Sequence, residues 1–494
     1  MNYTSTRDRS LSLTAAETIT RGLSPDGGLF VPESIPQIDE DFIAKLVPMS
    51  YAERSAAVMR LFLEEFSDEE LLEMTKAAYA NFYSESAAPL HPLNVHTSFM
   101  ELWHGPTCAF KDIALQILPR LLTASLKKTG EDKKVCILVA TSGDTGKAAL
   151  EGFKDVPGTG ILVFYPDGGV SDVQKLQMQS QTGANVSVCG VEGNFDDAQT
   201  GVKKIFSDPD IAKRLADKGW FLSSANSINW GRLLPQVVYY FSAYCDLVGT
   251  CSIQNGDAVS FCVPTGNFGD ILAGYYAKQM GLPVKKLICA SNSNDVLTEF
   301  FHTGVYNRNR PFYMTVSPSM DILVSSNLER LLFEISGHDD MFVTDCMDEL
   351  NKNGKYGVGR KVRDLLDETF WAGFCDEAGT KEEIGKVWKE NGYLMDTHTA
   401  VASQVLEQYR KASKTNNEYV VIVSTASPYK FCNAVLEGIG EQGEANGLDA
   451  LDKLAHETHV PAPLPLAKLR GAEVRFNEVC SKEAMPTVVE AFLK

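Results

Sequence analysis

The sequence predicts an α/β protein with two lobes, each built on a parallel β-sheet. Three observations support this fold class. Short apolar runs alternate with segments of helical periodicity, glycine-rich loops follow the apolar runs, and the pattern occurs in two separate series along the chain. The chain has 494 residues, more than one hydrophobic core usually spans, so we expect two or three domains.

The first series contains three strand-loop-helix units, which predict a small α/β lobe over residues 131–224. The first strand leads through Thr-Ser-Gly-Asp-Thr-Gly at residues 141–146 into a helix. Ser171 precedes the second helix, where a hydroxyl side chain can cap the first backbone N–H groups. The predicted strands are residues 135–140, 161–165 and 185–189, and the third helix covers residues 196–206.

The second series predicts a larger lobe, which we assign to residues 96–130 and 225–494. Its first strand leads through Pro-Thr-Gly-Asn-Phe-Gly at residues 264–269 into a helix, and its last apolar run ends in Ser-Thr-Ala-Ser-Pro at residues 424–428. Ligands of open parallel sheets bind outside the carboxyl ends of the strands, so we expect the loops of both lobes to share one cleft. The predicted strands are residues 258–263, 284–290 and 419–423, with a helix over residues 270–280.

Residues 1–95 predict a separate N-terminal domain. They mix helical patterns with proline-rich connections around Pro89 and Pro92. Residues 337–379 are rich in charge and glycine, and this composition fits either an insertion or a lid.

The composition excludes several classes of partner. The chain has 64 acidic against 46 basic residues, a formal net charge of −18, which disfavours binding to nucleic acids or to an anionic membrane. No apolar run approaches the roughly 18 residues that a membrane helix needs. The start of the sequence lacks the apolar segment of a secretion signal, so we expect a cytoplasmic protein. Whether it is a monomer or a homodimer stays open.

The eleven cysteines contain no Cys-x-x-Cys pair, which favours reduced, buried thiols over disulfides or a zinc site. Asp-Thr-His-Thr at residues 396–399 combines an acid, an imidazole and two hydroxyls, but no second histidine or carboxylate cluster completes a metal site. We interpret this segment as part of the fold or as support for neighbouring site residues.

Lys111 is a candidate nucleophile. It follows His-Gly-Pro-Thr-Cys-Ala-Phe at residues 104–110 and precedes an apolar helical pattern. A lysine at a helix start faces the positive end of the helix dipole, which disfavours its protonated form. Such a lysine suits imine formation and proton transfer, although an isolated lysine is far more often a solvated surface residue.

Three segments are candidate anion sites. Residues 266–269, Gly-Asn-Phe-Gly, join a predicted strand to a predicted helix, so their backbone N–H groups suit a phosphate, although a plain tight turn fits equally well. Residues 142–146 offer hydroxyls and N–H groups for a carboxylate or a second phosphate, with helix capping as the alternative. Arg232 is a candidate phosphate clamp, or else a surface arginine paired with local acids.

Five segments, in this order, resemble the threonine synthase family in its longer bacterial and fungal form. They are residues 104–116, 141–146, 226–232, 264–270 and 424–431. Two more stretches resemble the same family, so that the resemblance spans nearly the whole chain. These are Arg-Gly-Leu-Ser-Pro-Asp-Gly-Gly-Leu-Phe-Val-Pro at residues 21–32, and residues 319–330.

The resemblance implies a tryptophan-synthase-β-like architecture (fold type II) with an extra N-terminal domain, and pyridoxal 5′-phosphate as the cofactor. It implies that Lys111 forms the Schiff base and that Thr425 faces the pyridine nitrogen. A neutral hydroxyl, unlike a carboxylate, does not keep that nitrogen protonated. The cofactor-binding residues implied are Phe110, Lys111, Gly266, Asn267, Phe268, Gly269, Asp270 and Thr425.

The implied reaction is that of a lyase, which converts O-phospho-L-homoserine and water into L-threonine and phosphate in the last step of threonine biosynthesis. Lys111 is implied to act as acid and base. Asp144 replaces an Asn of many relatives of the wider fold, and an ionised Asp only accepts hydrogen bonds. The loop around Ser142 is implied to bind the substrate carboxylate. Asn226 and Arg232 are implied to bind the phosphate, with Lys147 as a helper. The substrate residues implied are Ser142, Asp144, Thr145, Lys147, Asn226 and Arg232.

Two other functions remain open. A phospholyase with the same cofactor would release phosphate, ammonia and 2-oxobutanoate, and the motifs do not distinguish it because water addition depends on closure of the site. A non-catalytic scaffold protein could keep the same fold. The joint presence of Lys111, Asn267 and Thr425 disfavours this second alternative.

Overall fold

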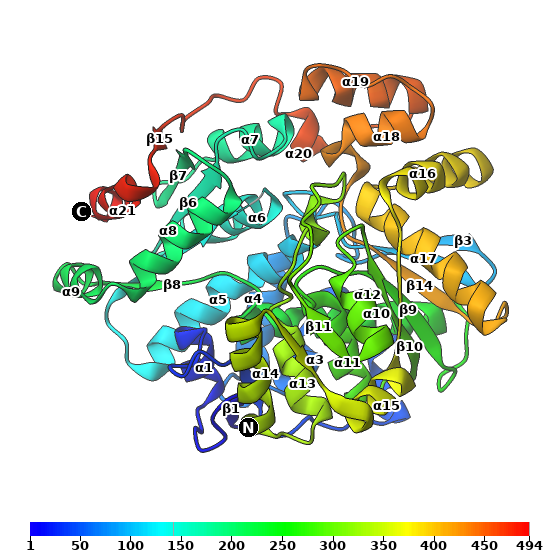
Figure 1. Cartoon of the computed structure of the whole chain (residues 1–494), viewed down its shortest axis with the longest axis horizontal. Coiled ribbons are helices and arrows are strands. Elements are labelled where there is room, and N and C mark those ends of the chain that lie inside the picture. The colour runs from blue at the N-terminus through cyan, green and yellow to red at the C-terminus, as the bar shows by residue number, and fades with distance from the viewer. Residues whose placement is uncertain (142, 494) are drawn as a thin grey trace.

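The computed structural model describes residues 1–141 and 143–493. Two β-sheets organise the molecule, which confirms the predicted fold class (Figure 1). The larger sheet has the strand order β13-β10-β9-β14-β4-β3, parallel except for the β3–β4 pair. The smaller sheet has the order β15-β7-β6-β5-β8 and is parallel throughout. The strands are β3 (Leu90–Asn94), β4 (Thr97–Glu101), β5 (Lys134–Ala140), β6 (Thr159–Pro166), β7 (Val186–Val191), β8 (Trp220–Ser223), β9 (Val259–Pro264), β10 (Val284–Ser291), β13 (Phe370–Phe374), β14 (Val420–Ser424) and β15 (Val479–Cys480).

The six strands predicted from apolar runs are confirmed as β5, β6, β7, β9, β10 and β14. Buried parallel strands are apolar on both faces, and this is the pattern that made them recognisable. The other five strands of these two sheets, β3, β4, β8, β13 and β15, were not predicted. β4 begins with Thr97 and Ser98, two polar residues that are nevertheless buried in the sheet, so it lacks a continuous apolar run.

Four helices cover the smaller sheet. Ser171 caps α7 as predicted, because its side chain accepts a hydrogen bond from the N–H of Gln174 while the Gln174 side chain accepts one from the N–H of Ser171. α8 packs against β5 and β6. The helices are α6 (Asp144–Phe153), α7 (Asp172–Gln179), α8 (Phe195–Ser207) and α9 (Pro209–Asp217).

Two long helices, α5 (Lys111–Thr129) and α10 (Trp230–Gly249), pack against each other in the interior. α10 is apolar around most of its circumference, as expected for a helix that other elements surround. No helix in residues 1–141 and 143–493 has both the length and the hydropathy to cross a bilayer.

The N-terminal region shares one hydrophobic core with both lobes. α1 packs on α5, and α3 packs on α10. β3 lies within the predicted N-terminal domain of residues 1–95 but joins the larger sheet beside β4. The other elements of this region are β1 (Tyr3–Ser5), α1 (Ala15–Arg21), β2 (Phe30–Pro32), α2 (Glu40–Leu46), α3 (Tyr51–Arg60) and α4 (Asp68–Tyr79).

The larger sheet is covered by α17 (Thr397–Ser413), which contacts β9, β10, β13 and β14, and by α11 (Gly269–Met280), which also packs on α10. Residues 337–379 are part of this lobe, because they supply its edge strand β13 and the helix α15 that contacts β10. The remaining elements are α12 (Val296–Thr303), β11 (Val305–Asn307), α13 (Leu328–Ile335), α14 (Asp340–Asn353), β12 (Lys355–Gly357), α15 (Gly359–Thr369), α16 (Glu377–Asn391), α18 (Cys432–Gly438), α19 (Gly447–Thr458) and α20 (Leu464–Ala467), with short 3-10 turns at Pro318–Met320, Pro428–Lys430 and Lys482–Ala484.

The C-terminal segment returns to the smaller lobe. β15 adds to β7, and α21 (Met485–Phe492) lies beside it at the red end of the chain in Figure 1. Met485 and Val489 are buried in the core of the smaller lobe, together with side chains of β5 and β6. The predicted boundary differs here, since residues 225–494 were assigned as a whole to the larger lobe.

Candidate functional site

Lys111 is the first residue of α5 and lies in the interior, with 9% of its surface exposed. Its Nζ donates to Ser319 Oγ at 3.4 Å and lies 4.0 Å from Asp144 Oδ2. Burial lowers the pKa of Lys111 to about 8, against the opposing effect of the Asp144 carboxylate. About a tenth of the amine is therefore unprotonated at pH 7, far more than for an exposed lysine, and this unprotonated form is the one that a nucleophile or general base requires.

The segment around Lys111 pairs with the segment that follows β14. The Phe110 N–H donates to the Thr425 carbonyl at 2.8 Å, and Ala109 forms an isolated bridge with Ala426. The Phe110 ring lies 4.7 Å from Lys111 Nζ. Thr425 is buried, and its hydroxyl has no hydrogen-bond partner within the described part of the chain.

The loop between β9 and α11 is shaped for an anion. The backbone N–H groups of residues 266–270 find no acceptor among the residues described, as expected at a helix N-terminus. A Cβ on Gly266 would lie 2.4 Å from the Ser319 carbonyl oxygen, so only glycine fits. Phe268 has a φ of +64° and its ring packs against Phe301 and Phe370. The Phe268 ring thus anchors the loop in the core, while the loop backbone is left for a ligand.

The Asp270 side chain lies away from this loop. Its Oδ1 accepts hydrogen bonds from the hydroxyls of Tyr239 and Tyr240, each at 2.7 Å, and its Oδ2 is buried without a partner in the described residues. Burial raises the pKa of Asp270 to about 6. Of the predicted cofactor-binding residues, Asp270 is therefore one whose backbone, rather than side chain, belongs to the loop.

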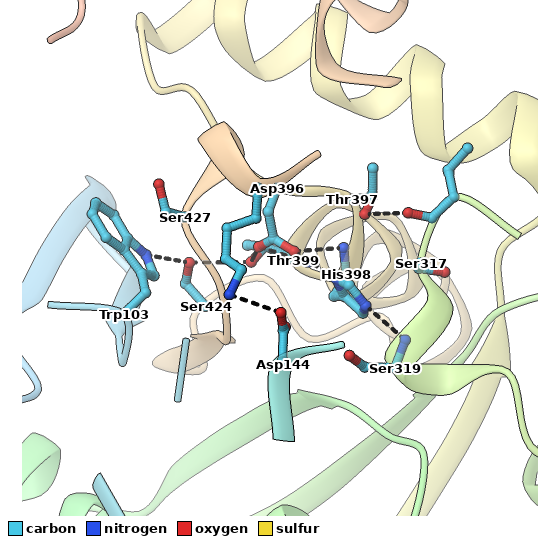
Figure 2. Close-up of polar contacts among 12 residues, drawn as sticks. Trp103, Asp144, Ser317, Ser319, Asp396, Thr397, His398, Thr399, Ser424 and Ser427 are labelled. Atoms are coloured by element: carbon cyan, nitrogen blue, oxygen red, sulfur yellow. Dashed lines mark hydrogen bonds and ion pairs between the residues drawn. The ribbon is translucent and has the colours of Figure 1, made fainter. Parts of the chain in front are cut away.

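Asp144 lies between two lysines. Its Oδ1 forms an ion pair with Lys430 Nζ at 2.7 Å and accepts a hydrogen bond from Gln174 at 2.8 Å (Figure 2 shows the Asp144 end of the ion pair). Burial acts to raise the pKa of Asp144, but the charges of Lys430 and Lys111 hold it well below its usual range. The sequence prediction did not single out Lys430. Its signal was present, since it is a lone lysine within the motif at residues 424–431, and the structure buries it completely.

The loop before α6 is organised by Thr141. The Thr141 hydroxyl accepts hydrogen bonds from the N–H groups of Gly143 at 3.0 Å and Gly146 at 2.9 Å. Thr145 is half-buried, and its hydroxyl has no hydrogen-bond partner in the described structure. Ser142, which the sequence also predicted as a substrate residue, lies outside the described residues.

Lys147 does not lie free in the site. Its Nζ forms an ion pair with Glu151 at 3.2 Å and a hydrogen bond with Gln181. Burial lowers the pKa of Lys147, and the Glu151 carboxylate opposes this effect.

Arg232 is a buried arginine near the start of α10, with 5% of its surface exposed. Its guanidinium donates to the Ala225 carbonyl at 2.6 Å, and no carboxylate of the described chain lies within ion-pair distance. Burial lowers the pKa of Arg232 to about 10. An arginine in this setting needs an anion from outside the chain. Asn226 precedes it in the same loop, and its side chain makes no hydrogen bond within the described structure.

A buried polar cluster at the start of α17 was interpreted from sequence as support. In the structure this cluster contacts the backbone of Ser319, the residue whose hydroxyl contacts Lys111. His398 forms hydrogen bonds with both Asp396 and the Ser319 backbone (Figure 2).

Three family models match the chain. The model described as "Threonine synthase N terminus" matches residues 2–79, "Pyridoxal-phosphate dependent enzyme" matches residues 86–426, and "Threonine synthase, C-terminal" matches residues 399–491. Together they account for most of the sequence.

Curated relatives agree with these models. The threonine synthase of Pseudomonas aeruginosa is 40% identical over 89% of this chain and 91% of its own length, and that of Saccharomyces cerevisiae is 37% identical over 99% and 97%. Human "Threonine synthase-like 1" is 41% identical over 86% of this chain, which spans only 58% of that longer protein.

Solved structures have the same fold over the full length. The PLP-bound threonine synthase of Brucella melitensis superposes with a TM-score of 0.89 at 37% identity, covering 100% of this chain and 98% of that one. The yeast threonine synthase gives a TM-score of 0.89 at 34% identity, with the same coverage.

Proposed function

The chain belongs to the threonine synthase family, and we propose that it converts O-phospho-L-homoserine and water into L-threonine and phosphate with pyridoxal 5′-phosphate as its cofactor. One observation carries the proposal. Burial lowers the pKa of the Lys111 amine to about 8, and the positive charge of Arg232, a buried arginine without an acid partner in the described chain, acts in the same direction. Cofactor and substrate both carry a phosphate, so the reaction needs two anion sites. The loop at residues 266–270 and Arg232 supply them.

The residues around Lys111 fit the cofactor. When bound, pyridoxal phosphate would supply an electron sink for negative charge that develops at the substrate carbon bonded to the amino nitrogen. Lys111 would hold the cofactor, the N–H groups of residues 266–270 would bind its phosphate, and the Thr425 hydroxyl would be the partner of its ring nitrogen. Supporting this assignment, both the N–H groups and the Thr425 hydroxyl lack partners in the described chain.

Arg232 and Asn226 bind the substrate phosphate in this proposal, and the loop carrying Ser142 and Thr145 binds the carboxylate. The buried guanidinium of Arg232 suits a phosphate because two parallel N–H groups can donate to two of its oxygens. The unpaired hydroxyl of Thr145 suits a carboxylate oxygen.

Two of the residues implied by resemblance receive other roles. We assign Asp144 to the orientation of Lys111 and Lys430, because an ionised acid repels a substrate carboxylate and its Oδ1 is already taken by Lys430 and Gln174. The pairing of Lys147 with Glu151 counts against a direct role in phosphate binding.

Lys111 moves the protons of the reaction. An amine with a pKa of about 8 takes a proton from carbon and returns one at similar driving force, which is the condition for efficient acid and base catalysis near neutral pH. The charged Asp144 nearby stabilises the protonated form that results from each abstraction.

The division into domains is also a proposal. We keep residues 131–224 as the small lobe and add the C-terminal β15 and α21 to it, since their apolar side chains lie in its core. The choice between monomer and homodimer stays a prediction.

Product analysis tests the function. Phosphate release from O-phospho-L-homoserine is measured for the holoenzyme of the wild type and of Lys111→Ala, with the organic product identified by mass spectrometry. We expect threonine from the wild type and none from the variant. 2-Oxobutanoate as the main product would instead identify a phospholyase, and no release by cofactor-loaded wild type would exclude both reactions.

A further inference from the structure

Asp396 is the centre of the buried cluster at the start of α17. It is fully buried and caps the helix, with Oδ1 accepting from the His398 N–H at 2.8 Å and from His398 Nδ1 at 2.8 Å. Its Oδ2 accepts from the Thr399 N–H at 3.3 Å and from the Thr399 hydroxyl. Four hydrogen bonds saturate an ionised carboxylate. Asp396 therefore has a fixed position and no capacity for another partner.

The contacts of His398 define its tautomer. The Ser319 backbone N–H donates to His398 Nε2 at 3.2 Å. Since a backbone N–H can only donate, Nε2 carries no proton, and the proton lies on Nδ1, where it is donated to Asp396. His398 is thus a neutral acceptor for Ser319, and the Phe431 ring packs against it with a centroid distance of 4.9 Å.

Ser319 contacts three parts of the site through three different groups. Its N–H donates to His398, and its hydroxyl accepts from Lys111 Nζ at 3.4 Å. Its carbonyl oxygen lies so close to Gly266 that a Cβ there would be 2.4 Å away. The orientation of Ser319 set by His398 therefore decides where its hydroxyl meets Lys111.

The same cluster reaches the segment on the other side of the site. The hydroxyls of Thr399 and Ser424 are 3.1 Å apart, and Trp103 Nε1 donates to Ser424 Oγ at 3.1 Å (Figure 2). Ser424 is the residue before Thr425. Asp396 thus holds the Ser319 segment through His398 and the Ser424 segment through Thr399.

We propose that Asp396 and His398 are positioning residues for proton transfer at Lys111, because they hold the Ser319 backbone so that the Ser319 hydroxyl stays within hydrogen-bonding reach of the Lys111 amine. A hydroxyl suits this task in both protonation states: it accepts from the ammonium and donates to the neutral amine. The charged groups facing Lys111 are Asp144, Arg232, Lys430 and Asp112, and none of them can donate and accept in turn. The inference rests on the proposed function only in that Lys111 is the proton carrier.

A matched pair of variants separates the two contacts of the imidazole. In His398→Asn the amide nitrogen can replace Nδ1 and still donate to Asp396, but the side chain is too short to reach Ser319. In His398→Gln the amide oxygen can replace Nε2 and still accept from Ser319. Ser319→Ala keeps the backbone N–H that His398 binds and removes only the hydroxyl.

The reactivity of Lys111 is measured in the apoprotein, from which the cofactor has been removed. The pH dependence of Lys111 acetylation by acetic anhydride is followed by mass spectrometry of the Lys111 peptide, with a midpoint near pH 8 expected for the wild type. Loss of an acceptor for the ammonium lowers the midpoint by about half a pH unit in His398→Asn and Ser319→Ala. His398→Gln is expected to stay close to the wild type. In the holoenzyme, His398→Asn lowers kcat and leaves KM nearly unchanged.

Two outcomes overturn the proposal. One is an unchanged midpoint in Ser319→Ala. The other is an equal change of the acetylation midpoint in His398→Asn and His398→Gln that parallels their loss of thermal stability. This is the result expected if His398 has only a structural role. The apoprotein result is also independent of the proposed function. If the wild type makes no threonine but His398→Asn and Ser319→Ala show the expected midpoint shifts, the reaction is refuted and the positioning role is kept.

Discussion

Asp270 is a buried acid in the first turn of α11, and burial raises its pKa from 3.8 to about 6. A carboxyl group of this kind favours the folded state when protonated, so its contribution is fully present below about pH 4 and is lost as the pH rises through 6. The difference corresponds to about 3 kcal/mol. Relative to the wild type, Asp270→Asn should therefore gain about 3 kcal/mol in unfolding free energy between pH 4 and pH 7.

Urea unfolding of both proteins at several pH values measures this gain. The control is Asp217→Asn, an exposed acid at the end of α9. An Asp270→Asn difference that is the same at every pH would contradict the raised pKa.

Arg232 places function and stability in opposition. Removing a buried charge that has no acid partner in the described chain relieves a desolvation cost, so we expect ligand-free Arg232→Met to be at least as stable as the wild type. In the cofactor-loaded protein, where the cofactor phosphate occupies the loop at residues 266–270, inorganic phosphate should raise the melting temperature of the wild type by binding at Arg232, and this protection should disappear in the variant. The loss of a bidentate contact should lower kcat/KM about 100-fold.

Thermal unfolding with and without phosphate, followed by steady-state kinetics, tests these expectations. Arg214→Met, at an exposed arginine paired with Glu490, is the control that should change neither property. Equal phosphate protection in Arg232→Met and the wild type would place the phosphate elsewhere.

At the scale of elements, the loop between β9 and α11 depends on its contact with the turn at Pro318–Met320. In Gly266→Ala the new methyl group would meet the Ser319 carbonyl at 2.4 Å, whereas in Gly269→Ala the nearest atom, Asn327 Nδ2, is at an ordinary 3.5 Å. The first change must displace backbone, and the second need not. We expect Gly266→Ala to weaken cofactor binding at least about tenfold more than Gly269→Ala, the equivalent of 1.4 kcal/mol or more.

Titration of each apoprotein with pyridoxal phosphate, followed by absorbance, gives the two dissociation constants. Similar constants for the two variants would mean that the loop tolerates a shift of Ser319. That result would also weaken the case for a fixed Ser319 beside Lys111.

For the whole molecule, the alternation of apolar runs and glycine-rich loops was enough to predict both sheets. The runs that became β5, β6 and β9 are continuous because these strands are buried on both faces. β4 was not predicted because Thr97 and Ser98 interrupt the pattern, and β15 was not predicted because two residues carry no periodicity. The return of the C-terminus to the smaller lobe is a long-range contact that local patterns do not encode.

For the candidate site, too, local sequence patterns were informative and long-range contacts were not. Lys111 and the loop at residues 266–270 could be predicted because each lies at the junction of a loop with a helix, where the local sequence defines the chemistry. The ion pair between Asp144 and Lys430 could not, since its partners are far apart in the sequence and meet only in the folded chain. His398 was likewise visible as a residue, but its contact with Ser319 was not.

The protein has a formal charge of −18, yet the buried cations Arg232 and Lys430 act on the Lys111 amine in its interior. Under the proposed function, a phosphorylated substrate would be repelled at long range by the net negative charge of the protein. It would be attracted at short range by the buried Arg232, which has no acid partner in the described structure. Raising the ionic strength from 0.01 M to 0.1 M shortens the screening length from about 30 Å to about 10 Å, which weakens the outer repulsion far more than the buried attraction. Capture of the substrate, measured as kcat/KM, should therefore become faster with added salt over this range, the reverse of what electrostatic steering by a basic surface would produce.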